Sequence, residues 1–378
     1  MTPQEQLPDE YNRMTRGDLH QRIARRKDEL AGNLCILGHH YQCDDVIAFA
    51  DFTGDSLKLS QLAAAQTDAG YIVFCGVHFM AESADILTAK EQVVCLPNLQ
   101  AGCAMADMAD ATDVAAALDE LRARSGAKIV PITYVNSSAT IKALTGEFHG
   151  ACCTSSNVRN VFEWALGGAE AGGAGADKIF CIPDEHLGRN TAFAMGRGEA
   201  DCAVYDPALP GGGISDHALD RATFLLWKGH CYVHQLFRPE HVLAVVKKHP
   251  GITVIVHPEC PRAVVELADA AGSTEQIIRA VATAAPGSKW AVGTESNLVN
   301  RLAKRHGDRF VRTLSDAPAA CAQMARIDLP HLLWVLDNLA HGRVVNRITV
   351  PRAVATDARV ALKRMIDIKA VADPTINP

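Results

Sequence analysis

The sequence has no apolar run of about 18 residues, the length that a membrane-spanning helix needs, which predicts a chain without a membrane span. Basic side chains are not in excess, because 37 lysines and arginines face 43 acidic residues and leave a formal net charge of −6. This balance excludes a general nucleic-acid binder. The polar start of the chain, Met1–Glu10, lacks the basic-then-apolar pattern of a signal peptide, so we expect a cytoplasmic protein.

Twelve cysteines are unusual for such a chain. Without a signal peptide they indicate thiols, metal ligands or redox chemistry rather than a disulfide framework. Most free cysteines are small buried hydrophobic residues, and those within apolar runs are expected in the core. We expect Cys152 and Cys153 to be reduced bystanders. Only a few of the cysteines are therefore expected to be ligands or reactive thiols.

Short β-rich runs alternate with Ala-rich helical stretches along most of the chain, after a lead-in helix expected over residues 9–31. Continuous apolar strands separated by helices are typical of parallel α/β sheets that are covered on both faces. The C-terminal part is expected to be helical. The expected strands are Leu34–Leu37, Tyr71–Cys75, Gln92–Leu96, Lys128–Thr133, Lys178–Ile182, Thr223–Leu226, Thr253–Val256, Lys289–Val292 and Arg309–Arg312.

An internal repeat organises these elements. Each copy has a strand, a polar cluster at the strand's carboxyl end, a helix and then a small hydroxyl motif; the copies begin at Cys35, Ile129 and Thr253 and reach Gly54-Asp-Ser, Thr154-Ser-Ser and Gly272-Ser-Thr. A second strand, an acidic residue, a third strand and a cysteine follow in each copy, and these cysteines are Cys103, Cys231 and Cys321. The spacing from His39 to Cys103 is 64 residues, as is that from His257 to Cys321.

The repeat predicts three similar three-layer α/β/α domains with short parallel sheets around a pseudo-threefold axis. We expect domains over residues 1–110, 111–235 and 236–324, with C-terminal helices within 325–378 packing back on the first. Ligands of open parallel sheets bind outside the carboxyl ends of the strands. The three polar clusters and three cysteines would then surround one central active-site cavity.

Three thiolates from three domains suit a four-iron four-sulfur cluster with one iron that lacks a protein ligand. That open iron would act as a Lewis acid and favour dehydration, while nearby His, Tyr and Glu side chains move protons. The hydroxyl motifs each open a helix, whose backbone N–H groups and positive dipole end suit phosphate or carboxylate.

Twelve motifs in order closely resemble the quinolinate synthase family over about residues 20–350. They are Gly38-His-His-Tyr-Gln, Gly54-Asp-Ser-Leu, Phe74-Cys-Gly-Val-His-Phe-Met-Ala-Glu, Ala101-Gly-Cys, Thr133-Tyr-Val-Asn-Ser-Ser, Thr154-Ser-Ser-Asn, Pro183-Asp-Glu-His-Leu-Gly, Trp227-Lys-Gly-His-Cys-Tyr-Val-His, His257-Pro-Glu-Cys, Gly272-Ser-Thr, Gly293-Thr-Glu and Cys321-Ala-Gln-Met. The resemblance implies condensation of iminoaspartate with dihydroxyacetone phosphate to quinolinate, phosphate and water, in de novo NAD biosynthesis. It also implies a 4Fe-4S cluster on three cysteines, one from each domain of a triangular fold.

By motif, the resemblance assigns the cluster ligands to Cys103, Cys231 and Cys321, which agrees with the repeat. The catalytic residues that it implies are His39, Tyr41, Tyr134, His257 and Glu259. The substrate-binding residues that it implies are Ser56, Asn136, Ser155, His234, Ser273 and Thr274. An L-aspartate oxidase or dehydrogenase that supplies iminoaspartate is a possible functional partner.

Two other readings remain open. The spacings Cys231-x-x-His234 and His257-x-x-Cys260 are ligand-like for a zinc enzyme, although zinc would not account for the threefold hydroxyl motifs. A non-catalytic iron–sulfur carrier or sensor would need no small-molecule pocket. Glu82 is expected to be structural, whereas structural and functional roles are equally open for Glu185, His186 and Glu295.

Overall fold

The computed structural model describes residues 5–368 of the chain. Contacts divide the chain into two compact units: unit 1 comprises Met1–Cys103 with Cys321–Pro351, and unit 2 comprises Ala104–Ala320 with Arg352–Pro378. Within the described residues, no helix combines the length and apolarity that crossing a membrane requires.

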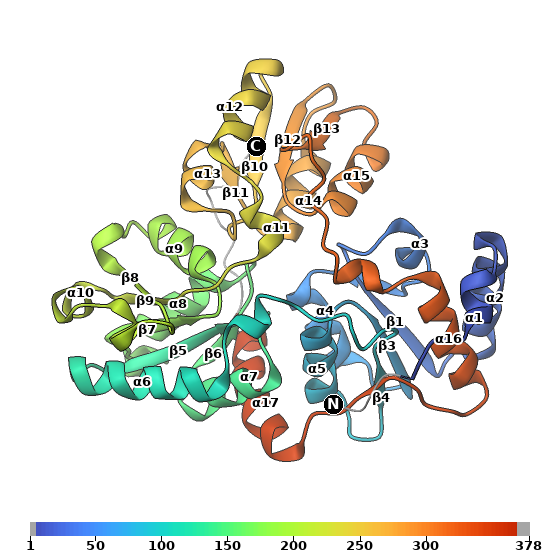
Figure 1. Cartoon of the computed structure of the whole chain (residues 1–378), viewed down its shortest axis with the longest axis horizontal. Coiled ribbons are helices and arrows are strands. Elements are labelled where there is room, and N and C mark those ends of the chain that lie inside the picture. The colour runs from blue at the N-terminus through green and yellow to red at the C-terminus, as the bar shows by residue number, and fades with distance from the viewer. Residues whose placement is uncertain (1–4, 369–378) are drawn as a thin grey trace. The chain divides into compact units, whose positions relative to one another are not determined.

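Unit 1 is built on one sheet with the strand order β14-β4-β3-β1-β2, of which Figure 1 labels β4, β3 and β1. Strands β1 to β4 run parallel, and β14 pairs antiparallel with the edge strand β4. The strands are β1 (Leu34–His39), β2 (Phe52–Gly54), β3 (Tyr71–Cys75), β4 (Val93–Cys95) and β14 (Arg347–Ile348). The helices are α1 (Asp9–Arg13), α2 (Arg16–Glu29), α3 (Asp44–Ile47), α4 (Ser56–Ala65), α5 (His78–Leu87) and α16 (Leu329–Ala340).

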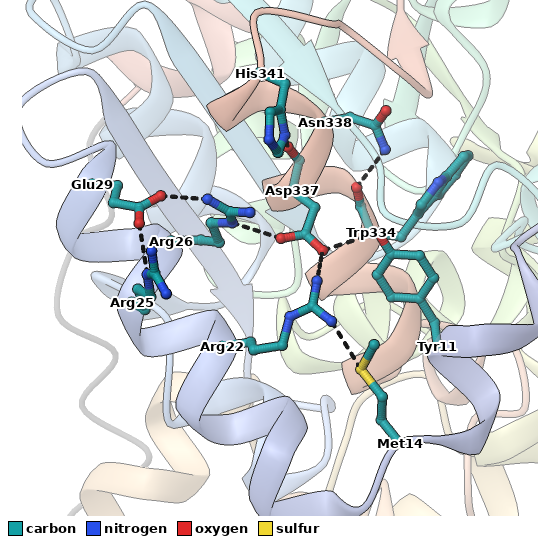
Figure 2. Close-up of polar contacts among 10 residues, drawn as sticks. All are labelled: Tyr11, Met14, Arg22, Arg25, Arg26, Glu29, Trp334, Asp337, Asn338 and His341. Atoms are coloured by element: carbon teal, nitrogen blue, oxygen red, sulfur yellow. Dashed lines mark hydrogen bonds and ion pairs between the residues drawn. The ribbon is translucent and has the colours of Figure 1, made fainter.

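The lead-in helix is in fact two helices, because Met14 is extended and the Thr15 side chain caps α2 by accepting from the backbone N–H of Asp18. Both helices are tied to α16 through Asp337, a buried carboxylate (Figure 2). The Tyr11 hydroxyl donates to Asp337 Oδ2 at 2.9 Å. Arg22 Nη2 and Arg26 Nε each donate to the same carboxylate at 2.6 Å. Burial, followed by this carboxylate, raises the pKa of Tyr11.

Replacing Asp337 with alanine is expected to destabilise the chain by about 2–4 kcal/mol, because two guanidinium groups and a hydroxyl would lose their common buried acceptor. Urea unfolding measures the change. Arg25→Ala is the matched control, since Arg25 pairs with Glu29 at the surface and its loss should cost about 0.5 kcal/mol or less. Equal stabilities of the two variants would contradict the anchoring role of Asp337.

The first sheet of unit 2 has the order β6-β5-β7-β9-β8, with all pairs parallel. Its strands are β5 (Ile129–Tyr134), β6 (Ala151–Cys153), β7 (Lys178–Ile182), β8 (Cys202–Tyr205) and β9 (Phe224–Trp227). The associated helices are α6 (Ala111–Ser125), α7 (Ala139–Glu147), α8 (Val158–Leu166), α9 (Glu185–Ala194) and α10 (Asp216–Arg221). An apolar core, which includes Leu118, Phe180 and Trp227, fills the space between α6 and this sheet.

The second sheet of unit 2 has the order β11-β10-β12-β13 and is also parallel throughout. Its strands are β10 (Thr253–Val256), β11 (Ala270–Ala271), β12 (Lys289–Gly293) and β13 (Phe310–Thr313). The associated helices are α11 (Tyr232–Gln235), α12 (Pro239–Lys248), α13 (Arg262–Leu267), α14 (Thr274–Thr283) and α15 (Ser296–Arg305).

The internal repeat of the sequence is visible in the strand order. Each sheet contains the same four parallel strands in one order, namely β2-β1-β3-β4, β6-β5-β7-β9 and β11-β10-β12-β13. The prediction of an α/β chain with short parallel sheets is therefore confirmed, and every strand that the sequence predicted is present to within two residues of its expected ends. The pseudo-threefold axis, the central cavity and the domain boundaries stay predictions.

One of the two C-terminal helices packs elsewhere than expected. Helix α16 packs on α2 within unit 1, but α17 (Arg352–Asp367) packs on α7 and β6 within unit 2 (Figure 1). The Asn157 amide donates to the backbone oxygen of Met365 at 2.9 Å, and Gly146 lies against the backbone of Asp357 without room for a Cβ. The expectation that both helices pack on the first domain is thus wrong for α17, because α7 offers it a close backbone contact.

Candidate functional site

Polar clusters stand at the carboxyl end of the first strand in each repeat, where open parallel sheets bind ligands. His39 is the last residue of β1 and Tyr134 is the last of β5, while His257 directly follows β10. All three side chains are buried. The buried apolar residues along these strands hold the strand ends in place, so the polar side chains start from a rigid base.

The unit 1 cluster contains His39, Tyr41 and Ser56. His39 Nδ1 accepts from the backbone N–H of Tyr41 at 3.1 Å, and the two rings meet edge-on with their centroids 4.7 Å apart. An accepting Nδ1 carries no proton, so a neutral His39 has its proton on Nε2. Ser56 is the first residue of α4, whose N-cap is the neighbouring Asp55. The cluster therefore combines an oriented imidazole with a helix N-terminus.

The unit 2 cluster is a buried polar network centred on Glu259. His234 Nδ1 lies 2.8 Å from Glu259 Oε2, and His257 Nδ1 lies 3.1 Å from the same oxygen. His257 Nδ1 also accepts from the backbone N–H of Glu259 at 3.4 Å. The two imidazole rings stack 4.4 Å apart with their planes inclined by 15°. At the outer ends, His234 Nε2 is 3.1 Å from Thr294 Oγ1, and His257 Nε2 is 3.2 Å from Ser155 Oγ.

The electrostatics of the His234–Glu259–His257 network favour a negatively charged Glu259. Burial alone would raise the pKa of Glu259, but the two imidazoles and their hydrogen bonds outweigh it and hold that pKa well below its ordinary value. Burial lowers the pKa of His234. The carboxylate lies close to both Nδ1 atoms, and each Nε2 faces a hydroxyl. Such an arrangement can take up or release a proton at Ser155 or at a ligand that contacts His257.

Two residues next to the Glu259 network, Asp184 and Asn190, were not predicted from the sequence. Asp184 is buried at the N-cap of α9, and burial followed by the charge of Glu259 raises its pKa well above the ordinary value. Asn190 Nδ2 donates to the backbone oxygens of Pro258 and Cys260, both at 2.8 Å, and so fixes the loop that carries Glu259. Asp184 stands in a motif that was noted, but only the fold brings it close to Glu259.

Tyr134 is the last residue of β5, and Asn136 lies two residues after it. Tyr134 is buried, and Asn136 is half-buried with an Oδ1 atom that has no hydrogen-bond partner among residues 5–368. A buried acceptor of this kind needs a donor from water or a ligand. Their location agrees with the contact to substrate that the resemblance implies, which stays a prediction.

The hydroxyl motifs of unit 2 line a cavity of about 340 Å³. Ser155 and Ser273 contribute to its wall, which also carries Arg159, Arg262 and Glu163. Arg159 pairs with Glu163 at 3.1 Å. Ser273 is the N-cap of α14, and its Oγ accepts from the backbone N–H of Gln276 at 3.3 Å. Thr274, the first residue of α14, is buried. Part of the hydroxyl motif is therefore structural, while the N-terminus of α14 at the cavity wall suits a small anion.

The three cysteines singled out by the sequence share a local setting. Cys103, Cys231 and Cys321 are half-buried. Cys231 is the N-cap of α11, and Cys103 and Cys321 each come three residues before a 3₁₀ turn, Ala106–Met108 and Met324–Arg326. Cys103 and Cys321 belong to unit 1 and Cys231 to unit 2.

Most other cysteines are poor thiolate ligands, because burial raises their pKa. Burial raises the pKa to about 12 for Cys35, Cys95 and Cys152 and to about 11 for Cys202, and it holds the pKa of Cys75, Cys153, Cys181 and Cys260 well above the ordinary thiol value. Cys152 and Cys153 are both free thiols. The donor set of three half-buried thiols therefore fits an iron–sulfur cluster chemically.

Of the two spacings that suggested a zinc enzyme, Cys231-x-x-His234 and His257-x-x-Cys260, the structure supports only the first. Ligand atoms of Cys231, His234 and Glu259 lie within 4.8 Å of one another. Cys260 does not join them, since its fully buried thiol lies 3.6 Å from the backbone oxygen of Gly293. Glu295, left open by the sequence, caps α15 by accepting from the N–H groups of Asn297 and Leu298.

Comparisons with known proteins agree with these features. The family model described as "Quinolinate synthetase A protein" matches residues 21–367. The quinolinate synthase of Acidobacterium capsulatum is 52% identical over 365 residues, covering 96% of each chain. That of Geobacillus thermodenitrificans is 50% identical over 363 residues, covering 95% of this chain and 96% of its own. That of Streptomyces coelicolor is 50% identical over 353 residues, covering 92% and 88%. With its repeated α/β sheets and its strand-end clusters, the chain belongs to the quinolinate synthase family.

Proposed function

We propose that this chain is a cytoplasmic quinolinate synthase that condenses iminoaspartate with dihydroxyacetone phosphate to form quinolinate, phosphate and water for de novo NAD biosynthesis. The observation that carries the proposal most directly is the buried His234–Glu259–His257 network, which ends on Ser155 at the wall of a cavity. Family membership supplies the reaction, and the network supplies groups that suit its several proton transfers.

Cys103, Cys231 and Cys321 would hold the 4Fe-4S cluster, as the only three cysteines that follow the repeat. When bound, the cluster supplies a Lewis-acidic iron without a protein ligand, which assists loss of a hydroxyl during dehydration.

The remaining chemistry falls to this chain's own side chains. The helix N-termini at Ser56 and Ser273, with Thr274, and the Ser155 hydroxyl, which precedes the N-cap of α8 by two residues, would bind the carboxylates and the phosphate. His257 would move protons from its Nε2, since Glu259 holds its Nδ1. Burial of the network keeps water from an imine that hydrolyses readily.

Tyr41 and Tyr134 are the further candidates for proton transfer, and His39 orients Tyr41 through its ring contact. Tyr134→Phe should leave iron content unchanged and lower kcat by about 10²-fold, because only the phenolic O–H is removed. Single-turnover formation of quinolinate measures this. A Tyr134→Phe variant with the parent rate would eliminate that role.

The activity itself is tested by incubating anaerobically purified protein with iminoaspartate and dihydroxyacetone phosphate and detecting quinolinate chromatographically. Iminoaspartate generated in place by an L-aspartate oxidase or dehydrogenase also tests whether such a partner increases the rate. Formation of quinolinate is expected. Its absence with a cluster-loaded protein would favour the non-catalytic carrier.

A zinc enzyme is the second candidate, because Cys231, His234 and Glu259 could share one metal ion. It predicts that His234→Ala removes the metal. The cluster model predicts that His234→Ala keeps iron and sulfide and loses activity, so metal analysis of this variant separates the two.

A further inference from the structure

Two loops of unit 1 that flank predicted cluster ligands are hydrogen-bonded to each other. Asn98 lies five residues before Cys103, and Arg326 lies five residues after Cys321. Asn98 Nδ2 donates to the backbone oxygen of Arg326 at 3.2 Å. In return, Arg326 Nη1 donates to Gln100 Oε1 at 3.0 Å. The chain segments are 228 residues apart in sequence, so this contact is made only by the fold.

Both polar atoms of the Asn98 side-chain amide have hydrogen-bond partners. Asn98 is only 5% exposed, and its Oδ1 accepts from the backbone N–H of Gln100 at 2.9 Å. The second Nδ2 hydrogen faces His331 Nε2 at 3.2 Å. His331 Nδ1 lies 2.7 Å from Asp328 Oδ1, which favours the tautomer whose Nε2 accepts. An aspartate or an alanine at position 98 would leave buried polar groups unsatisfied.

Each loop is also anchored to its own surroundings in unit 1. The side-chain contacts of Asn98 and Arg326 then connect the two anchored loops. The Asn346 amide donates to the backbone oxygen of Pro97 at 2.8 Å, and the N–H of His78 donates to that of Ala101 at 2.8 Å. On the other side, Met324 is buried and its sulfur accepts from Gln42 Nε2 at 3.5 Å. Gln42 follows directly after Tyr41 in the His39 loop.

We propose that Asn98 is a positioning residue that fixes the loop of Cys321 against the loop of Cys103, and so sets the placement of both thiolates for the metal group that they bind. This inference rests on the proposed function. Ligands must be held within about 0.5 Å of their working geometry by groups around them, and removal of such a group typically weakens metal binding about 10- to 100-fold.

The experiment measures iron release. Parent protein, Asn98→Ala and Asn98→Asp are reconstituted anaerobically, and the rate of iron transfer to a ferrous chelator is followed by absorbance. Both variants are expected to release iron at least about tenfold faster than the parent. Asn98→Asp tests the hydrogen-bond pattern, since its carboxylate would face the carbonyl oxygen of Arg326.

Asn338→Ala is the matched control. Asn338 also lies in unit 1 and donates one side-chain hydrogen bond to a backbone oxygen, that of Trp334 at 2.7 Å (Figure 2), but it touches neither cysteine loop. It should release iron at the parent rate. His331→Ala is a second variant, in case Asn98→Ala fails to fold. It removes one Asn98 partner and should accelerate release by a smaller factor.

Unchanged release from folded Asn98→Ala, or from His331→Ala where the former does not fold, would overturn the inference. Equal acceleration in Asn338→Ala would also overturn it, because general loosening would then explain the effect. Parent protein without iron and sulfide would instead overturn the proposed function, and the inference with it.

Discussion

Glu259→Gln is expected to lower kcat by about 10²- to 10⁴-fold, the usual contribution of acid–base catalysis, with the chain still folded. One oxygen of the carboxylate lies 2.8 Å from His234 Nδ1 and 3.1 Å from His257 Nδ1. A glutamine retains the shape but loses the negative charge that faces the two imidazoles. His257, whose Nε2 lies 3.2 Å from Ser155 Oγ, would lose that charged neighbour. Steady-state quinolinate formation measures the effect, and KM should change less than kcat.

The control for this variant is Glu120→Gln. Glu120 is a glutamate of the same unit that pairs with Arg124 at 3.3 Å and takes no part in the proposed site. It should retain the parent kcat. If Glu259→Gln folded with a normal melting curve and a kcat within a few-fold of the parent, the buried His234–Glu259–His257 network would not be responsible for proton transfer.

Cys231→Ser has the second large expected effect, namely loss of the cluster from a folded protein. Cys231 occupies the N-cap of α11, and its backbone oxygen accepts from the N–H of Gln235 at 2.9 Å. Serine is a favoured N-cap residue, so the fold should persist, but its hydroxyl is a poor substitute for a thiolate on iron. Anaerobic reconstitution followed by iron and sulfide analysis should give far less than the parent content.

Cys202→Ser is the comparison for this loss. Cys202 is another half-buried cysteine of unit 2, and burial raises its pKa to about 11, so it should stay a thiol and bind no iron. The variant should load like the parent. A Cys231→Ser protein that loaded and held the full cluster would remove Cys231 from the ligand set.

The sequence predicted the repeated sheet well because its central strands are continuous apolar runs. Strands β2, β6, β8, β11 and β14 escaped it, since they are edge strands of two to four residues. Of these, β2, β6 and β11 lie at the start of the hydroxyl motifs. Such strands are set by pairing with β1, β5 and β10 rather than by an apolar pattern of their own. The break between α1 and α2 was not predicted either, because it depends on the Thr15 cap within a run of residues that otherwise favours one helix.

The candidate site was predictable residue by residue only where motifs carried it. His234, His257 and Glu259 were named from the sequence, and the structure brings them together with Ser155. Thr294, Asp184 and Asn190 were not, because their roles depend on contacts across 60 or more residues, as in the pairs Thr294–His234 and Asn190–Pro258. No local pattern marks a threonine or an asparagine for such a contact.

The most direct test of the account is the content of iron and acid-labile sulfide in protein purified without oxygen, with zinc measured on the same sample. The account predicts about four irons and four sulfides per chain, in line with a 4Fe-4S cluster on Cys103, Cys231 and Cys321. Stoichiometric zinc without sulfide would contradict it and would favour a metal held by Cys231, His234 and Glu259.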